Sequence, residues 1–448
     1  MHTDHRTSRR SAATLRAAAD FPADRQDRKQ TRTGRARAQR VAAPGVLLAL
    51  LYTSASALAQ GAVFHVAPQG PLTDIQAAVN AAGNGDLVKV APGVYPGFSI
   101  VGKQVAVVGV DPLTDDPATY TVAAAAGTPA IRIEQLLGNQ LVTVSGARIQ
   151  HTDQLAPAIV VSDNLFANVR LQDIVVTTAT GLGNAPYSAV IEARDTGSLW
   201  LDRVECGDHR TYGNTISGGG LAALLCDTTP VHTNRCDLRG LRSANPLAAG
   251  GDGLRLQGLD GTAWLVDTVL YGGMSAAGAV PLSAGGHAIH DFDGLAGTVT
   301  ACDCTLEVSV STVAQYAIAG GPAALPVCDD RTIGRTELTP FASSLRIGSS
   351  ATVSVSANVT NRAFLLVVDE GFGHLQLTSL FAGTMLFSGG EVPVTAGLLG
   401  ASGYQHSLQL PFVPGAVGMH VTLQSALLEP AGAAPQWSLT SAAGFTVR

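Results

Sequence analysis

The sequence has 448 residues, of which 46% are hydrophobic and only 14% are charged, and it contains 50 glycines. A chain of this length can form two domains with a large core, and the shortage of charged residues argues against a long helical protein. Residues 1–40 carry 11 of the 28 basic residues and 4 of the 34 acidic ones. The remaining 17 basic and 30 acidic residues give the rest of the chain a net charge of −13. This balance argues against nucleic acid as a partner, because a phosphate backbone needs a basic face.

Residues 1–60 have the features of a disordered basic leader followed by a signal peptide. Residues 1–40 are rich in arginine and show no hydrophobic periodicity. The apolar run 46–52 is too short to anchor a chain in a bilayer, and Ala57-Leu58-Ala59 follows it as a small-residue cleavage site. We therefore predict cleavage after Ala59, a secreted or cell-surface location, and no membrane anchor in the mature chain.

The segment 71–110 predicts one short helix and three short strands. Ile75, Ala78, Val79 and Ala82 recur at helical spacing, and Thr73 or Asp74 is placed to cap the first turn. Apolar strand-like runs follow the helix as far as Gly109, separated by glycine and proline turns. Strands this short cannot form a core by themselves, so we expect them to be the first layer of a repeating structure.

Six later segments can be aligned with one another, and their starts lie 28 to 35 residues apart. They begin at Pro129, Pro157, Ser188, Leu221, Asp252 and His287. Each contains two strand-like runs, which is the pattern of a β-solenoid whose repeats bury their apolar faces by stacking. The loops 178–187, 207–220 and 243–252 are expected to leave the corners of the repeats and to wall a groove. The repeat fades near Val308.

The chain is predicted to divide into a solenoid at residues 61–328, a linker at 329–337 and a second domain at 338–448. The last segment alternates strand-like runs with glycine, asparagine and proline, which favours a small antiparallel β-sandwich. The predicted fold class is therefore all-β: a parallel solenoid with an N-terminal cap helix, followed by a β-sandwich.

The runs DIQAAV, GDLVKVAPGVY and IVGKQVAVVG between Asp74 and Gly109 resemble the opening of pectin-lyase-like right-handed parallel β-helix proteins. The resemblance implies that the helix plugs the end of a right-handed β-helix. It does not imply one reaction, because this superfamily includes lyases, hydrolases, esterases, epimerases and binding proteins. No catalytic set of its enzymes carries over: Gly286-His287-Ala288 departs from the Gly-His-Gly motif of polygalacturonases, and the three lysines, Lys29, Lys89 and Lys103, cannot supply their Arg-x-Lys motif.

Six cysteines follow the leader: Cys206, Cys226, Cys236, Cys302, Cys304 and Cys328. An even number in an exported chain permits disulfides. The favoured pairs are Cys206 with Cys226, and Cys302 or Cys304 with Cys328. The alternative is that several are small apolar residues of the interior.

The densest cluster of polar residues is His287, His290, Asp291 and Asp293, with Asp252 and Arg255 one repeat earlier. Strand alternation gives His290 and Asp291 opposite facing. Either His287, Asp291 and Asp293 share a surface with His290 turned away, or the reverse holds. Carboxylates with a histidine can perform acid–base catalysis or hold Ca²⁺. The competing and favoured interpretation is that Asp-Phe-Asp-Gly simply builds a turn.

Two functions remain open at this point. The first is an exported, non-catalytic module that binds carbohydrate or a cell-surface component, or has a structural role, and it needs no cofactor. The alternative is a lyase or hydrolase acting on a pectin-like or other polysaccharide, with its site around His287 and Asp291. Trp200 and Trp264 occupy one column of the repeat, and they would stack on sugars if they face outward but belong to the core if they face inward.

Overall fold

The computed structural model describes most of the chain after residue 60. The described ranges are 61–151, 156–178, 189–207, 220–242, 250–258, 262–273, 286–292, 299–307, 318–319, 327–328, 335–339, 344–357, 362–370, 375–376, 381–382, 384–385, 392–410, 416–428 and 437–448. All of them belong to one compact unit, Gly45–Arg448. The predicted leader, its cleavage site and most of the three predicted loops lie outside the described residues.

The described residues are nearly all in β-structure, with 64% in strands and 3% helical. The sequence-based expectation of an all-β chain is confirmed at this level. No helix among the described residues is long and apolar enough to cross a membrane.

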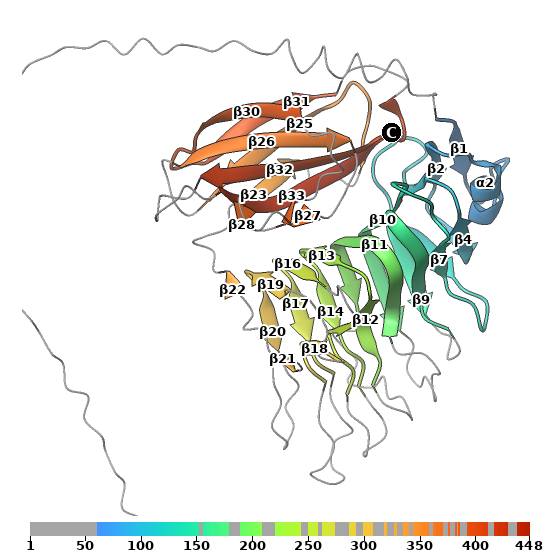
Figure 1. The fold of residues 1–448 in the computed structure, drawn as a ribbon. Coiled ribbons are helices and arrows are strands. Elements are labelled where there is room, and N and C mark those ends of the chain that lie inside the picture. The colour runs from blue at the N-terminus through green and yellow to red at the C-terminus, as the bar shows by residue number, and fades with distance from the viewer. Residues whose placement is uncertain are drawn as a thin grey trace, which may run out of the picture. The chain divides into compact units, whose positions relative to one another are not determined.

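The larger part of the described chain forms one parallel sheet of 22 strands (Figure 1). Its strands are β1 (Val63–Val66), β2 (Asp86–Val90), β3 (Val94–Pro96), β4 (Phe98–Val101), β5 (Val105–Gly109), β6 (Tyr120–Ala123), β7 (Ile131–Glu134), β8 (Leu141–Ser145), β9 (Ala147–His151), β10 (Ile159–Thr178), β11 (Ala189–Cys206), β12 (Ala222–Asp227), β13 (Val231–Asn234), β14 (Asp237–Arg239), β15 (Leu254–Gln257), β16 (Ala263–Val266), β17 (Val269–Tyr271), β18 (Ile289–Asp291), β19 (Val299–Cys302), β20 (Thr305–Glu307), β21 (Ile318–Ala319) and β22 (Val327–Cys328).

Strands of this sheet pair with the third strand along the chain, as in β2 with β5, β5 with β8, and β12 with β15. The long strands β10 and β11 each run through three strand positions, so that β10 pairs with β7, β8 and β9 in turn. Each repeat therefore has a first strand (such as β7, β12, β15 and β18), a second strand (β8, β13, β16) and a third strand (β9, β14, β17).

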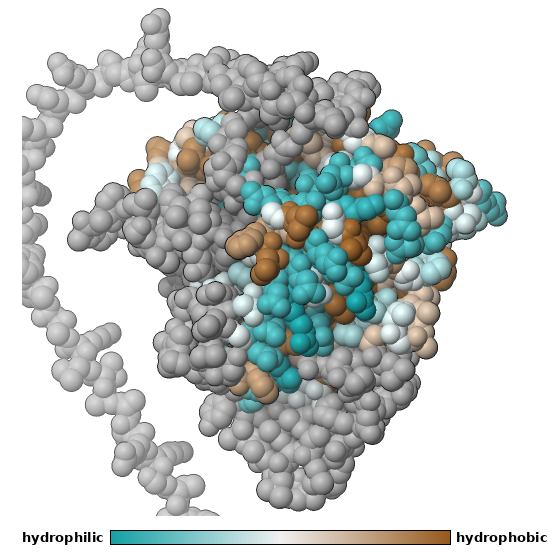
Figure 2. All heavy atoms as spheres, turned by 45° about the vertical axis from the view of Figure 1, so that its right-hand side comes forward, coloured by the Kyte–Doolittle hydropathy of each residue, from teal (hydrophilic) through white to brown (hydrophobic). Residues whose placement is uncertain are grey.

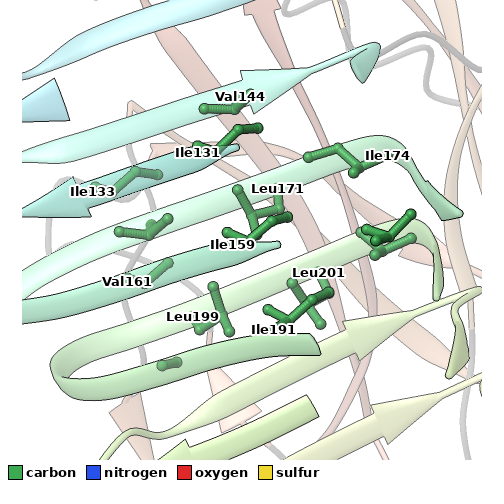
Figure 3. Close-up of a cluster of buried hydrophobic side chains, with 14 of the residues drawn as sticks. Ile131, Ile133, Val144, Ile159, Val161, Leu171, Ile174, Ile191, Leu199 and Leu201 are labelled. Atoms are coloured by element: carbon green, nitrogen blue, oxygen red, sulfur yellow. The ribbon is translucent and has the colours of Figure 1, made fainter. Parts of the chain in front are cut away.

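The core of the parallel sheet consists of apolar columns, because alternate residues of a strand share one facing. On the first strands, Ile131, Ile159 and Ile191 are in register and fully buried. On the second strands, Val144 and Leu171 are in register in the same way. Figure 3 shows these side chains of neighbouring repeats lying together. The predicted alignment of the repeats agrees with this register to within one residue.

The predicted helix is α2 (Ile75–Ala81), which lies at the β1 end of the sheet (Figure 1). The Asp74 carboxylate caps it by accepting a hydrogen bond from the Gln76 backbone N–H at 3.0 Å. Ile75, Ala78 and Val79 are buried, as their spacing predicts. The Lys103 ammonium donates to the carbonyl oxygens of Val79, Asn80 and Ala82, so its charge lies at the negative end of the helix dipole.

The C-terminal part of the described chain forms mainly antiparallel sheets. Its strands are β23 (Arg335–Thr339), β24 (Ser344–Leu345), β25 (Ser350–Ser356), β26 (Ala363–Glu370), β27 (Leu375–Gln376), β28 (Phe381–Ala382), β29 (Thr384–Met385), β30 (Val392–Leu398), β31 (Tyr404–Gln409), β32 (His420–Leu428) and β33 (Trp437–Val447). One buried cluster joins the three-stranded sheet β23–β25–β31 to the larger sheet that contains β26, β32 and β33.

Within the segment 61–328, the parallel sheet continues past Val308, where the repeat fades in the sequence, because β21 and β22 pair with β18 and β19. One detail differs from the sequence-based expectation. The C-terminal sheets begin within the segment 329–337 that the sequence favoured as a linker, since β23 starts at Arg335. There Thr336 and Leu338 are buried among the C-terminal strands. The polar residues beside them in the sequence gave no indication of this packing.

Candidate functional site

The candidate residues come from two consecutive first strands. Asp252 precedes β15 and Arg255 lies on it, while His287 precedes β18 and His290 lies on it. The parallel register pairs Leu254 with Ile289, which places Arg255 directly beside His290. Residues 35 to 38 positions apart in sequence are therefore neighbours in space.

Asp252 is the centre of this cluster, and its side chain is almost fully buried. The Arg255 guanidinium donates to Oδ2 from Nε at 2.8 Å and approaches it with Nη2 at 2.7 Å. His290 Nδ1 lies 3.0 Å from the same oxygen, and the His287 backbone N–H donates to Oδ1 at 3.0 Å. One carboxylate thus ties two repeats together.

These contacts fix the protonation of the cluster. Burial by itself raises the pKa of Asp252, but the hydrogen bond from His290, the charge of Arg255 and the His287 backbone N–H outweigh burial, so that the pKa lies below its ordinary value. An ionised carboxylate only accepts hydrogen bonds. His290 must therefore carry its proton on Nδ1, which leaves Nε2 as the basic nitrogen of the ring.

Two aromatic rings lie beside His290. Its ring centroid lies 5.0 Å from that of His287 and 5.6 Å from that of Phe292, both edge to face. The Arg255 guanidinium carbon lies 5.5 Å from the Phe292 centroid. His287 and His290 are half-buried, whereas Phe292 is exposed, so the imidazoles lie at the boundary with solvent.

The structure groups the predicted residues differently from both sequence-based alternatives. His287 and His290 lie together. His287 precedes the strand, so the alternate facing of successive strand residues does not determine the direction of its side chain. Asp291 is in register with the buried Leu256, which gives it the opposite facing to His290. Asp293 lies outside the described residues.

The donor set limits the chemistry of the cluster. Asp252, His287 and His290 each offer one ligand atom, and these three atoms lie within 4.8 Å of one another. Two imidazoles and one carboxylate differ from the six to eight oxygen ligands that Ca²⁺ takes, and they match the ligands of Zn²⁺-type ions. Asp252 is the one carboxylate among these three residues.

Trp200 and Trp264 occupy one outward column of the second strands, two repeats apart, as the sequence indicates, with His232 between them. Both are buried. Trp200 forms a buried cluster with Leu141 and with Ala442 of β33, so the C-terminal sheets cover this ring. A buried ring offers no surface for stacking on a sugar.

The cover over the second strands is a feature that sequence reasoning missed. We call its parallel-sheet residues the covered face: Leu141, Thr143, Arg170, Gln172, Trp200 and Asp202. Thr143 Oγ1 lies 2.9 Å from His420 Nδ1, and Gln172 Nε2 donates to the Gly444 carbonyl oxygen at 3.3 Å. Arg335 also forms ion pairs with Asp267 and Asp303. The row of polar and aromatic residues on consecutive second strands was the sequence feature that could have indicated this cover.

The third strands present a different outward surface, the open face: Arg148, Gln150, Glu205, Asp237, Arg239 and Tyr271. Arg148, Gln150 and Glu205 are exposed, and the other three are half-buried. Arg239 donates to both carboxylate oxygens of Asp237 at 2.8 and 3.1 Å, and its guanidinium carbon lies 5.7 Å from the Tyr271 centroid. Figure 2 shows hydrophilic side chains gathered over the part of the parallel sheet that includes β7, β9 and β10, with smaller hydrophobic groups between them.

The favoured pair of Cys206 with Cys226 is not formed. Cys206, Cys226, Cys236 and Cys304 are free thiols. Cys206 and Cys226 point into the apolar interior, where they act as small hydrophobic residues. Burial raises the pKa of Cys206 to about 12, and the charge of Asp237 adds to this effect.

Comparison with known proteins adds no relative: no family model, no curated protein and no solved structure matches this chain.

Proposed function

We propose that this chain is an exported right-handed parallel β-helix protein that carries a C-terminal β-sandwich. The parallel pairing of each strand with the third one along supports a β-helix with three strands per coil. The resemblance of residues 74–109 to pectin-lyase-like proteins supports its hand and its cap helix. The signal-peptide features of residues 41–60 support export.

We further propose that the protein is a non-catalytic module that binds carbohydrate or a cell-surface component. The observation that carries this proposal is the state of Asp252, whose carboxylate is buried and already engaged by Arg255, His290 and the His287 backbone. A carboxylate held in this way is a structural tie between coils. It is a poor proton donor because its pKa is lowered.

The open face is the surface that best suits an extended polymer. Neighbouring strands of a sheet lie about 4.8 Å apart, so their outward side chains form regular rows along the β-helix. Arg239, Asp237 and Tyr271 combine hydrogen-bonding groups with an aromatic ring. Such a combination can bond to sugar hydroxyls while a ring packs against an apolar sugar face.

The test is an assay of retention and turnover on one set of polysaccharides. The mature chain is run through gels that contain neutral or acidic polysaccharides, and the same mixtures are assayed for new reducing ends and for unsaturated uronates. We expect retention on at least one polymer without product.

Arg239→Ala should weaken retention about tenfold, the effect of one lost charged hydrogen bond. Arg194→Ala on a first strand is the matched control, because Arg194 also pairs with a carboxylate of its own strand, Glu192. Failure to bind any polymer, or equal loss in both variants, would contradict the proposal.

The alternative is a polysaccharide lyase or hydrolase, and one observation favours it. Asp252 orients His290 and directs its proton to Nδ1, which leaves Nε2 able to accept a proton. If product appears in the assay and His290→Asn abolishes it in a protein with an unchanged melting temperature, the enzyme replaces the binding module as the proposed function.

A further inference from the structure

The cluster of Asp252, His287 and His290 has a second use that the binding function does not require. We propose that these residues bind one divalent transition-metal ion of the Zn²⁺ type, with a fourth coordination position left open to an exchangeable ligand. The proposal rests on the distances, the donor types and the support of the carboxylate.

The distances suit a shared ion. Two ligand atoms of a tetrahedral Zn²⁺ site, each about 2.0–2.1 Å from the ion, lie about 3.3 Å apart. Asp252 Oδ2 and His290 Nδ1 are already 3.0 Å apart. The ligand atom of His287 lies within 4.8 Å of both, so a small rotation of that side chain closes the set. The ion takes the place of the proton between Asp252 and His290, and the neutral imidazole then carries its single proton on Nε2 instead of Nδ1.

The carboxylate is held in place by groups that are not ligands. Arg255 contacts Oδ2, and the His287 backbone N–H donates to Oδ1. Partners of this kind orient a metal ligand and are a regular part of metal sites. They also fix the side chain of Asp252 before the ion arrives, which reduces the entropy lost on binding.

The donor types select the ion. Imidazole and carboxylate suit Zn²⁺ and its neighbours, whereas Ca²⁺ and Mg²⁺ prefer oxygen ligands alone. The two imidazoles are half-buried, so a ligand from solvent can complete the coordination. A site with three protein ligands and one exchangeable position has the composition of the open zinc sites of proteins. Because Arg255 balances the charge of Asp252, the bound ion leaves the site positive and therefore favours an anionic fourth ligand.

The experiment uses the mature chain after removal of bound metals with a chelator. Zn²⁺ is titrated in a calorimeter, and Co²⁺ binding is followed by its visible absorption, which reports tetrahedral coordination. We expect one ion per chain. The near-ultraviolet band of a cobalt–thiolate bond should be missing, because the proposed ligands include no cysteine.

Two variants remove the ligands with little change to the fold. His290→Asn keeps an N–H donor at the position of Nδ1, and His287→Gln keeps the backbone N–H that Asp252 accepts. Each should weaken Zn²⁺ binding at least tenfold, with the melting temperature of the metal-free protein unchanged. His65→Gln, an exposed histidine on β1, is the matched control and should bind as the parent chain does.

Three results would overturn the proposal: no binding of either ion below millimolar concentration, binding of more than one ion with equal affinity, or equal affinity in all three variants. The last result would place the ion elsewhere. The polysaccharide assay is read separately, so the metal site and the binding function can fail independently.

Discussion

The covered face and the open face carry polar side chains in the same alternating pattern, but they differ in what lies on them. Thr143, Arg170 and Asp202 of the covered face are at most 2% exposed, whereas Arg148 and Glu205 of the open face are exposed. Facing outward from a repeat is therefore not the same as facing water. The alternation of polar and apolar residues reports only which side of a strand is the interior of its own sheet.

The two faces also differ in how their charges are satisfied. On the covered face, Asp202 accepts hydrogen bonds from Gln172, Asn234 and Arg203 at 2.7–2.9 Å, which links three repeats. On the open face, Asp237 is bonded by Arg239 of its own strand. A buried polar group without a partner is costly, which makes the hydrogen bonds around Asp202 valuable. The guanidinium of Arg170, which forms no hydrogen bond among the described residues, instead lies against the Trp200 ring. The polar groups of the open face need no such network, because water can form their hydrogen bonds.

The sharpest test of this difference is the removal of an aromatic ring from each face. Trp200 is fully buried, and the Arg170 guanidinium carbon lies 4.4 Å from its centroid. Trp200→Ala should lower the free energy of unfolding by about 4–5 kcal/mol, because both a large buried side chain and a cation–π contact are lost. Tyr271→Ala on the open face should cost under about 1 kcal/mol. Urea unfolding followed by fluorescence and circular dichroism measures both. Equal losses would mean that the C-terminal sheets do not cover Trp200 in solution.

A carboxylate on each face gives the second test. Asp202→Ala leaves the donors of Gln172 and Asn234 buried without their partner, and should cost about 3 kcal/mol. The value lies at the lower end for a broken buried ion pair, because Arg203 keeps its bonds to Asp173 at 2.6 and 3.1 Å. Asp237→Ala removes a pair that water screens and should cost about 0–1 kcal/mol. The same unfolding curves measure both variants. A loss of about 2 kcal/mol or more for Asp237→Ala, well above the value of an exposed ion pair, would contradict the distinction.

The contact between the covered face and the C-terminal sheets should depend on pH. Burial and, as the smaller cause, the positive charge of Arg170 together lower the pKa of His420 to about 3. The folded protein therefore holds His420 neutral, while the unfolded chain protonates it near pH 6.5. Stability from this group is complete well above pH 6.5 and is lost as the pH falls from about 6.5 toward 3, with a slope that reaches about 1.4 kcal/mol per pH unit. Unfolding measured at several pH values checks this.

The matched comparison for the pH experiment is between two histidine variants. His420→Gln should flatten the acid limb of the stability profile, while His65→Gln on the exposed strand β1 should leave it as in the parent chain. If both variants keep the full acid dependence, carboxylates elsewhere control it and His420 is not the group responsible.

Sequence patterns predicted those parts of the molecule whose structure is determined by residues near one another in the sequence. Spacing located the helix at Ile75–Ala81, and the Asp74 cap follows from its position before the first turn. Alternation and repeat length aligned the apolar columns and placed Trp200 and Trp264 in one column. Both results follow because strand and helix periods are properties of the backbone.

What the sequence did not predict depends on contacts between distant segments. The cover over Thr143 comes from His420, which lies 277 residues later. The grouping of His287 with His290 depends on the loop before β18, to which strand alternation does not apply. Arg335 was assigned to a linker because its neighbours are polar, yet it pairs with Asp267 and Asp303 of the parallel sheet. No local pattern contains such partners.

The interior between the faces gives the last prediction and the smallest effect. Cys206 and Cys226 are both fully buried there as free thiols, although the sequence favoured them as a disulfide pair. The thiolate is the reactive form, and burial raises the pKa of both groups, with Cys206 at about 12. Among the five cysteines whose burial the structure describes, we expect a thiol reagent at pH 8 to react with the native protein chiefly at the less buried Cys304, and the buried thiols to react only on unfolding. Reductant should change the free energy of unfolding by less than about 0.5 kcal/mol, as for a substitution without structural effect. Loss of a disulfide would instead cost about 2–5 kcal/mol, so a large drop in melting temperature with reductant would show that these two cysteines are joined.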